Sequence, residues 1–253
     1  MCGRFAVTTD PARLAVQLDA ADETGAATGA PVWTPNYNVA PTTDIAAVVA
    51  RHDEPDDRAT RRIRLMRWGL LPPWVKPGAD GRPLVKAQLI NARAETLTTS
   101  PAFRSASRRR RCLVPMDGYY EWARVADQPR KTPYYMFGHD DGPLLAAGLW
   151  SVWKPDRSDP AAVAPTLSAA IVTTDAVGEL ARVHDRMPLV LAERDWDRWL
   201  DPDAPAPAEL LVAPPDIGGI AMREVSTLVN KVANNGPELI APVDRGNQPV
   251  GLF

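Results

Sequence analysis

The second residue of the chain is a cysteine, in a sequence that begins Met1-Cys2-Gly3-Arg4-Phe5. Removal of Met1 would turn Cys2 into a 1,2-aminothiol. The amine of such a group can add to an aldehyde to give a Schiff base, and the sulfur can then close onto the same carbon to give a thiazolidine ring. With a pKa of about 8 for an α-amine and about 8.5 for a thiol, both nucleophiles are available near neutral pH. The simpler alternative is that position 2 merely accepts a small residue.

Three other polar side chains occur where a packed strand would not require them. Asn91 lies in the segment 90–96, Glu121 follows two tyrosines, and His184 precedes an aspartate and an arginine. A carboxylate and an imidazole can move protons near neutral pH, and an amide both donates and accepts hydrogen bonds. Each also has a structural explanation, since Glu121 could pair with an arginine and His184 could be an ordinary surface side chain.

Composition narrows the setting. The chain has 253 residues, of which 45% are hydrophobic and 24% charged, as in a globular protein of one large or two small domains. It contains no apolar run of about 20 residues and no basic start followed by an apolar segment, so we expect no membrane span, no secretory signal and a cytoplasmic location. Its two cysteines, Cys2 and Cys112, lack metal-ligand spacing. We therefore expect no disulfide, no metal and no cofactor.

The net charge is −2, but the basic residues are clustered. One cluster comprises Arg61, Arg62, Arg64 and Arg67, and the other comprises Arg108–Arg111. Such runs are usually solvated faces, and we expect this of both clusters. The alternative for Arg108–Arg111 is that they extend a basic groove.

The order of the expected elements favours an α+β fold. Asp10 and Pro11 have the types expected at a helix start, ahead of Leu14, Val16 and Leu18. Further helices are expected over 101–107, 175–183 and 193–200. Short apolar or alternating runs indicate strands over 45–49, 63–68, 112–114, 134–137, 144–149, 167–172, 189–191 and 222–226.

This order contains more strands than helices and lacks a regular strand-helix alternation, so a curved antiparallel sheet or open barrel-like core flanked by helices is favoured over a doubly wound fold. We expect a single domain over 1–253, in which 241–253 could form a loose tail.

Taken together and in this order, the motifs resemble one family, the SOS response-associated peptidase (SRAP) proteins. The resemblance covers essentially the whole chain. It is carried by residues 1–5, 38–41, 68–74, 90–96, 118–122, 184–188, 229–231 and 236–240. The resemblance implies an SRAP-type domain that senses and shields abasic sites in single-stranded DNA by forming a thiazolidine crosslink through Cys2. The electrophile would be the C1′ aldehyde of the ring-opened deoxyribose.

The resemblance also implies roles for individual residues. Glu121 would transfer protons at the Cys2 amine and the sugar, and His184 would act as acid and base at the sugar oxygen. Asn91 would hold the Cys2 terminus and the sugar. Arg4, Arg93 and Arg186 follow Cys2, Asn91 and His184 by two residues, which would place positive charge beside the lesion. Residues that would contact sugar, bases or backbone are Asn38, Pro41, Trp68, Trp74 and Arg104.

Two other function classes remain open. Cys2, His184 and Glu121 also suit a cysteine peptidase, although the sequence reveals no peptide pocket. A single-strand binder without covalent chemistry would show steep salt dependence and no crosslink. An associated lyase activity and removal of Met1 by the protein itself are compatible with the first reading. One-to-one capture needs only a monomer.

Overall fold

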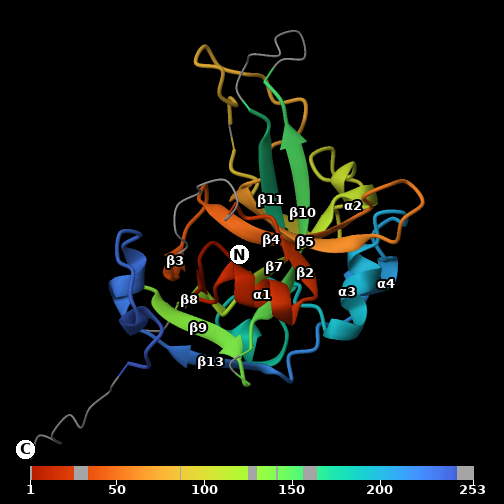
Figure 1. Ribbon diagram of the computed structural model, residues 1–253. Helices are drawn as coiled ribbons and strands as arrows, with labels where there is room; N and C mark the ends of the chain where they lie inside the picture. Colours follow the sequence, from red (N-terminus) through yellow and green to blue (C-terminus); the bar gives the residue numbers. More distant parts are fainter. Residues whose placement is uncertain are drawn as a thin grey trace, which may run out of the picture.

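The computed structural model describes residues 2–25, 34–85, 87–124, 130–140, 142–155 and 164–243. Met1 and the part of the expected tail beyond residue 243 lie outside them. The described chain forms two β-sheets with short helices around them (Figure 1). This mixed fold, dominated by strands, confirms the α+β prediction.

The larger sheet has eight strands, of which five form a closed ring. Its main path is β12 (Arg186–Pro188), β11 (Thr166–Asp175), β10 (Leu144–Trp153), β7 (Arg111–Met116), β4 (Asp44–Arg51), β5 (Thr60–Trp68) and β2 (Ala20–Asp22). β6 (Asn91–Arg93) pairs with β11 beside this path. A short parallel pairing of β5 with β11, Ser168 opposite Arg67 and Ala169 opposite Trp68, closes the barrel that we expected to be open.

In the smaller sheet, the N-terminal strand lies between two other strands and not at an edge. Its order is β13 (Ile220–Glu224), β9 (Thr132–Gly138), β8 (Gly118–Ala123), β1 (Phe5–Val7) and β3 (Asn36–Val39). Because β1 is paired on both sides, the residues just before it are held at a fixed position.

Short helices and 3₁₀ turns lie around the two sheets and connect their strands. They are α1 (Pro11–Gln17), α2 (Ala106–Arg109), α3 (Glu193–Leu200) and α4 (Ala208–Val212), with 3₁₀ turns η1 (Gly178–Arg182), η2 (Thr227–Asn230) and η3 (Pro237–Leu239). The Asp10 side chain accepts a hydrogen bond from the Ala12 amide at 2.7 Å, as predicted for an N-cap. The outer ends of β10 and β11 extend from the barrel beside the segment that contains Val75, whose carbonyl accepts a hydrogen bond from Nε1 of Trp153 at 2.7 Å (Figure 1).

Apolar residues are buried in two main clusters. One lies where α1 and α3 pack on the larger sheet and includes Leu14, Leu18 and Trp199. The other joins the two sheets and includes Cys2, Phe5 and Trp68. The second cluster therefore places the N-terminal residues against the barrel.

Some local predictions were wrong at element boundaries. The strand expected over 189–191 lies instead at Arg186–Pro188, and Val190 makes only an isolated bridge to Ala146. The helix expected over 175–183 is only the short η1, because Asp175 still belongs to β11 and Gly178 adopts a positive φ of 55°. The expected helix over 101–107 is mostly turns, with α2 beginning at Ala106, and α4 was not expected.

Arg111 is not part of a solvated face. It is 2% exposed, and its guanidinium donates hydrogen bonds to the carbonyl groups of Trp199, Ser107, Arg108, Asp201 and Ala204. Five carbonyl oxygens solvate the buried charge without a carboxylate, so this arginine fastens the end of α3 to β7.

Gly118 should tolerate no side chain, because β8 and β9 approach each other too closely there. A Cβ atom at position 118 would lie 2.3 Å from the carbonyl oxygen of Met136 and 2.5 Å from the ring of Tyr135. We expect Gly118→Ala to lower the free energy of unfolding by about 1–3 kcal/mol, measured by urea denaturation. Gly219→Ala is the control, since a Cβ there meets nothing within 4 Å. Equal midpoints for the two variants would contradict this packing.

Candidate active site

Cys2 lies just before β1 and is fully buried. Its carbonyl oxygen accepts a hydrogen bond from Nδ2 of Asn91 at 2.8 Å. Asn91 is the first residue of β6, which runs parallel to β11 with Asn91 opposite Ile171. The amide of Asn91 thereby links the N-terminal segment to the barrel.

Glu121 and His184 lie on the same side of the molecule as this link. The Glu121 side chain, on β8, is 4% exposed, and its Oε2 atom is 4.0 Å from Nε2 of His184. His184 lies between η1 and β12 and is one-quarter exposed. The negative charge of Glu121 acts on the Cys2 thiol. The structure thus brings together all four residues predicted to be catalytic.

Burial controls the protonation of this cluster. It raises the pKa of the Cys2 thiol far above its ordinary value, and the charge of Glu121 raises it further. The thiol is therefore protonated at neutral pH. Burial also raises the pKa of Glu121, while the nearby His184 acts in the opposite direction. A carboxyl group with a raised pKa can exchange protons closer to neutral pH than an ordinary glutamate.

Two contacts at Nδ1 decide which ring nitrogen of His184 carries the proton. The Arg186 amide donates to Nδ1 at 3.0 Å, whereas the carboxylate of Asp185 lies 2.7 Å from the same nitrogen. The first contact requires an unprotonated Nδ1 and the second a protonated one. Because the Asp185 side chain is 85% exposed and solvated, the backbone contact is the stronger constraint on the tautomer. In that tautomer the proton lies on Nε2, toward Glu121.

Three of the predicted DNA-contacting residues are engaged within the protein. Nη1 of Arg4 donates to Oδ1 of Asn38 at 2.6 Å and to the Val229 carbonyl at 2.9 Å. Nδ2 of Asn38 donates to three carbonyl groups in the segment 229–234. Arg186, 9% exposed, binds Glu95 and Asp175 at 2.5 Å each and the Thr173 carbonyl at 2.7 Å. In this structure these side chains position the strands and turns around the site.

The remaining predicted contacts differ in accessibility. Trp68 is fully buried, its ring packs against Phe5 at a centroid distance of 5.0 Å, and its Nε1 donates to the Ile90 carbonyl. This placement contradicts stacking of a base on Trp68, because the ring offers no solvent-facing surface. The other four residues can be reached from solvent: Trp74 is 65% exposed, Arg93 and Arg104 are exposed, and Pro41 is partly exposed.

Sequence analysis overlooked one polar group in this region, the hydroxyl of Tyr119. Tyr119 precedes Glu121 by two residues on β8, so both side chains point to the same face. Its hydroxyl and Oδ1 of Asn91 are buried without a hydrogen-bond partner among the described residues. The two-residue spacing from Glu121 was the signal in the sequence.

The described residues contain no group of three metal-ligating side chains close enough to hold an ion. Within the same ranges, no helix is long and apolar enough to cross a membrane.

Comparisons with known proteins identify the family. The model of the SRAP family, described as SOS response associated peptidase, matches residues 1–232. The chain belongs to this family.

Among curated SRAP relatives, abasic site processing protein YoaM from Bacillus subtilis (strain 168) is 35% identical over 210 residues, covering 82% of this chain and 85% of YoaM. Abasic site processing protein HMCES from Rattus norvegicus is 30% identical over 240 residues, covering 84% of this chain and 66% of HMCES. A solved structure from Bacteroides thetaiotaomicron, 22% identical, has a TM-score of 0.77 over 95% of this chain and 99% of its own. A phage-related protein from Bordetella bronchiseptica, 29% identical, has a TM-score of 0.61 over 88% and 94%.

Two neighbouring tyrosines of this SRAP domain should respond oppositely to loss of the hydroxyl group. Tyr119→Phe removes a buried hydroxyl without a partner in the described chain, so we expect an unchanged or slightly higher free energy of unfolding. Tyr120→Phe removes a hydrogen bond to the Tyr37 carbonyl at 2.7 Å and should cost about 1 kcal/mol. Thermal and urea denaturation of both variants would measure this. Clear destabilisation by Tyr119→Phe would show that its hydroxyl is paired.

The raised pKa of Glu121 predicts a pH-dependent stability of the SRAP domain. Between the ordinary glutamate pKa and the raised folded value, the native state binds more protons than the unfolded chain, so stability falls as pH rises. Glu121→Gln removes this loss. Its advantage over wild type should grow from pH 4 upward, by about 1.4 kcal/mol for each pH unit between the two pKa values, and then level off.

Urea denaturation from pH 4 to 8 would measure the difference. Glu179→Gln is the control, because its side chain is 61% exposed. A difference between Glu121→Gln and wild type that is constant across the pH range would contradict the raised pKa.

Proposed function

We propose that this protein captures abasic sites in single-stranded DNA as a covalent thiazolidine at Cys2, once Met1 has been removed. The observation that carries the proposal is the convergence of Cys2, Asn91, Glu121 and His184 on one site. Its context is a family whose curated relatives are named abasic site processing proteins. The substrate is the ring-opened sugar, whose C1′ aldehyde is the electrophile.

The protonation of the site favours attack by the amine before the sulfur. With the thiol kept protonated by burial, the first bond is formed between the Cys2 nitrogen and C1′ to give a carbinolamine. Loss of its hydroxyl as water requires a proton donor, and Glu121 with its raised pKa suits that role. The sulfur then adds to the imine carbon while the thiol proton passes to the nitrogen, directly or through Glu121, which closes the five-membered ring.

His184 and Asn91 act on the sugar and on the terminus. Nε2 of His184 faces Glu121 and can exchange a proton with the sugar oxygen as the furanose opens. Asn91 fixes the Cys2 carbonyl at 2.8 Å and leaves its own Oδ1 as a buried acceptor toward the reacting groups. Positioning of this kind lowers the entropic cost of bringing the amine and the aldehyde together.

The accessible side chains supply contacts to the DNA. Arg93 and Arg104 are exposed cations suited to phosphates, and Trp74 offers a ring on which a base can stack. Arg4, Asn38 and Arg186 support the site through the protein contacts described above. Capture joins one protein to one lesion and needs only a monomer.

A cysteine peptidase using Cys2, His184 and Glu121 is less well supported. Such an enzyme requires an activated thiolate, whereas burial and the nearby carboxylate both stabilise the protonated thiol here. The proposal leaves room for a lyase step, because the Schiff base that precedes ring closure also permits β-elimination.

The proposed crosslink can be tested on denaturing gels with single-stranded DNA that carries one abasic site. We expect a slower-migrating adduct with wild type and at least a 100-fold loss of adduct with Cys2→Ala. Cys112→Ala is the matched control, since Cys112 is the other buried free thiol but, inside the chain, has no free α-amine with which to form a thiazolidine. The proposal fails if Cys2→Ala retains the adduct, or if wild type lacking Met1 forms none.

A further inference from the structure

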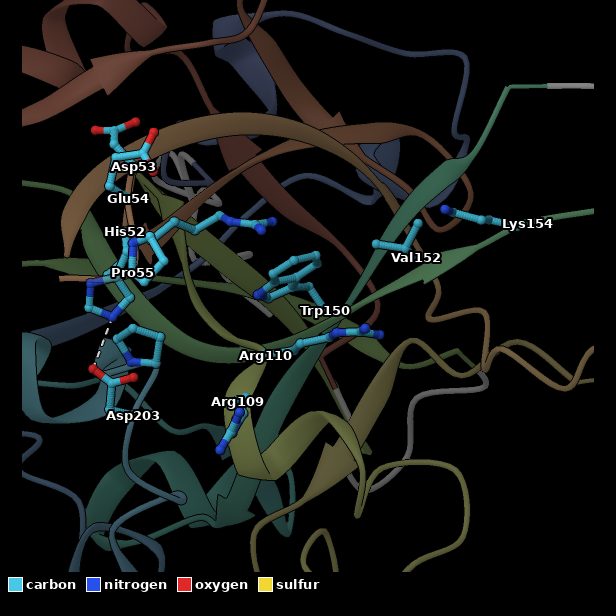
Figure 2. A pocket seen from close by; sticks show the side chains of 13 residues that line it. His52, Asp53, Glu54, Pro55, Arg109, Arg110, Trp150, Val152, Lys154 and Asp203 are labelled. Atoms are coloured by element: carbon cyan, nitrogen blue, oxygen red, sulfur yellow. Dashed lines mark hydrogen bonds and ion pairs between the residues drawn. The ribbon is translucent and has the colours of Figure 1, made fainter. Parts of the chain in front are cut away.

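A cleft of about 630 Å³ opens between the β4–β5 turn, α2 and β10, and none of the four proposed catalytic residues lines it. We call it the basic cleft, because four cations line it. The lining residues that matter for the argument are Arg51, Arg109, Arg110, Trp150, Val152 and Lys154 (Figure 2). Trp150, Val152 and Lys154 alternate along β10 and its end, so they share one face of that strand.

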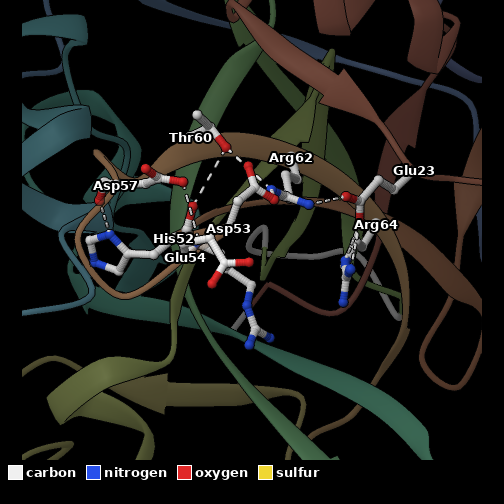
Figure 3. A network of polar contacts seen from close by, with 9 residues as sticks. Glu23, His52, Asp53, Glu54, Asp57, Thr60, Arg62 and Arg64 are labelled. Atoms are coloured by element: carbon white, nitrogen blue, oxygen red, sulfur yellow. Dashed lines mark hydrogen bonds and ion pairs between the residues drawn. The ribbon is translucent and has the colours of Figure 1, made fainter.

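Within the part of the chain that the structure describes, the cations of the basic cleft are not paired with carboxylates. Arg51, Arg109, Arg110 and Lys154 make no ion pair with any of the residues that the structure describes. Two of the three carboxylates that line the same cleft are already bound. Asp203 contacts His52 at 2.9 Å (Figure 2), and Asp53 pairs with Arg62, which also binds Glu23 (Figure 3). The lining therefore carries four cations, Arg51, Arg109, Arg110 and Lys154, against three carboxylates, one of which is paired with Arg62, so the cleft is electropositive.

Two of the guanidinium groups are held in place by an aromatic ring. The central carbon atoms of the Arg51 and Arg110 guanidinium groups each lie 5.7 Å from the centroid of the Trp150 ring. A cation-π contact restricts a guanidinium group without cancelling its charge, so its N–H donors stay available to an anion. Trp150 is 6% exposed and therefore supports the arginines rather than stacking on a ligand itself.

The cations are spread along the cleft and do not converge on one point. Figure 2 shows Arg109, from α2, and Lys154, beyond the end of β10, on opposite sides of Trp150 and Arg110. Lys154 is four positions beyond Trp150, a separation of about 13 Å along an extended chain, so it lies well beyond the two arginines that pack on Trp150. A single phosphate requires donors that meet at one place, whereas an extended row suits a chain of phosphates.

We propose that the basic cleft binds the phosphodiester backbone of an undamaged stretch of DNA. This inference rests on the proposed function, which identifies DNA as the chain of phosphates. Backbone contacts of this kind carry no sequence preference and would hold the flanking DNA whatever its bases.

The test uses Arg109→Gln/Arg110→Gln/Lys154→Gln and measures binding of an undamaged single-stranded 30-mer by fluorescence anisotropy between 50 and 200 mM salt. We expect affinity to fall about 10-fold at 100 mM salt. The slope of log K against log salt should become shallower by about 2, because each lost phosphate contact to a single strand removes about 0.7. Arg109→Glu/Lys154→Glu changes two exposed side chains and should weaken binding further without affecting the fold.

Arg13→Gln/Arg194→Gln/Arg198→Gln is the charge-matched control, with all three positions exposed on α1 and α3. Unchanged binding by both cleft variants, or an equal loss in the control, would overturn the inference. If millimolar inorganic phosphate bound at the cleft while the cleft variants left DNA affinity unchanged, the cleft would be a site for a small anion. That result would also overturn the inference. Crosslinking to a short abasic oligonucleotide should stay at the wild-type level in the cleft variants, whereas its absence in wild type would refute only the proposed function.

Discussion

The hydrogen-bond ladders of β11 hold the barrel and the candidate site in one frame. This strand pairs with β10, β12, β5 and β6. Pairing with β5 closes the barrel, pairing with β6 fixes Asn91, and pairing with β12 fixes the segment after His184. Because backbone pairing tolerates little displacement, two of the four candidate catalytic residues, Asn91 and His184, are held in place by the barrel. Cys2 and Glu121 reach the same place from the smaller sheet, through β1 and β8.

Burial at the site acts in the same direction on the thiol of Cys2 and the carboxyl group of Glu121, because it raises the pKa of both. A thiol surrounded by apolar groups stays protonated, which protects it from oxidation and from adventitious electrophiles. The same environment raises the proton affinity of Glu121. In the proposed reaction, the carboxyl group and the sulfur would therefore exchange protons without a permanent charge, which would be costly to bury.

The sequence predicted much of this arrangement because its signals were local. Asp10 and Pro11 define a helix start through contacts within two residues, and the alternating apolar runs locate most of the strands. The family motifs identified Cys2, Asn91, Glu121 and His184. The binding partners of the arginines were not predictable in this way. In the sequence, an arginine that binds phosphate looks the same as one that is bound by oxygen atoms of the protein. Arg186 meets Glu95 across 91 positions, and Arg111 meets carbonyl groups of residues 199–204, about 90 positions away. The burial of Trp68 and of the Tyr119 hydroxyl likewise depends on how the two sheets meet.

The hydrogen bonds that Arg4 and Asn38 make with the segment 229–234 affect how the protein folds during synthesis. Arg4 donates to the carbonyl oxygen of Val229, a residue 225 positions later in the chain. Contacts of such long sequence separation form late, because the intervening chain must first be ordered. During synthesis, the hydrogen bond between Arg4 and Asn38 can form early, but the one to Val229 cannot form until Val229 has emerged from the ribosome. The segment that holds Cys2, although it is translated first, is therefore among the last parts of the molecule to be locked in place.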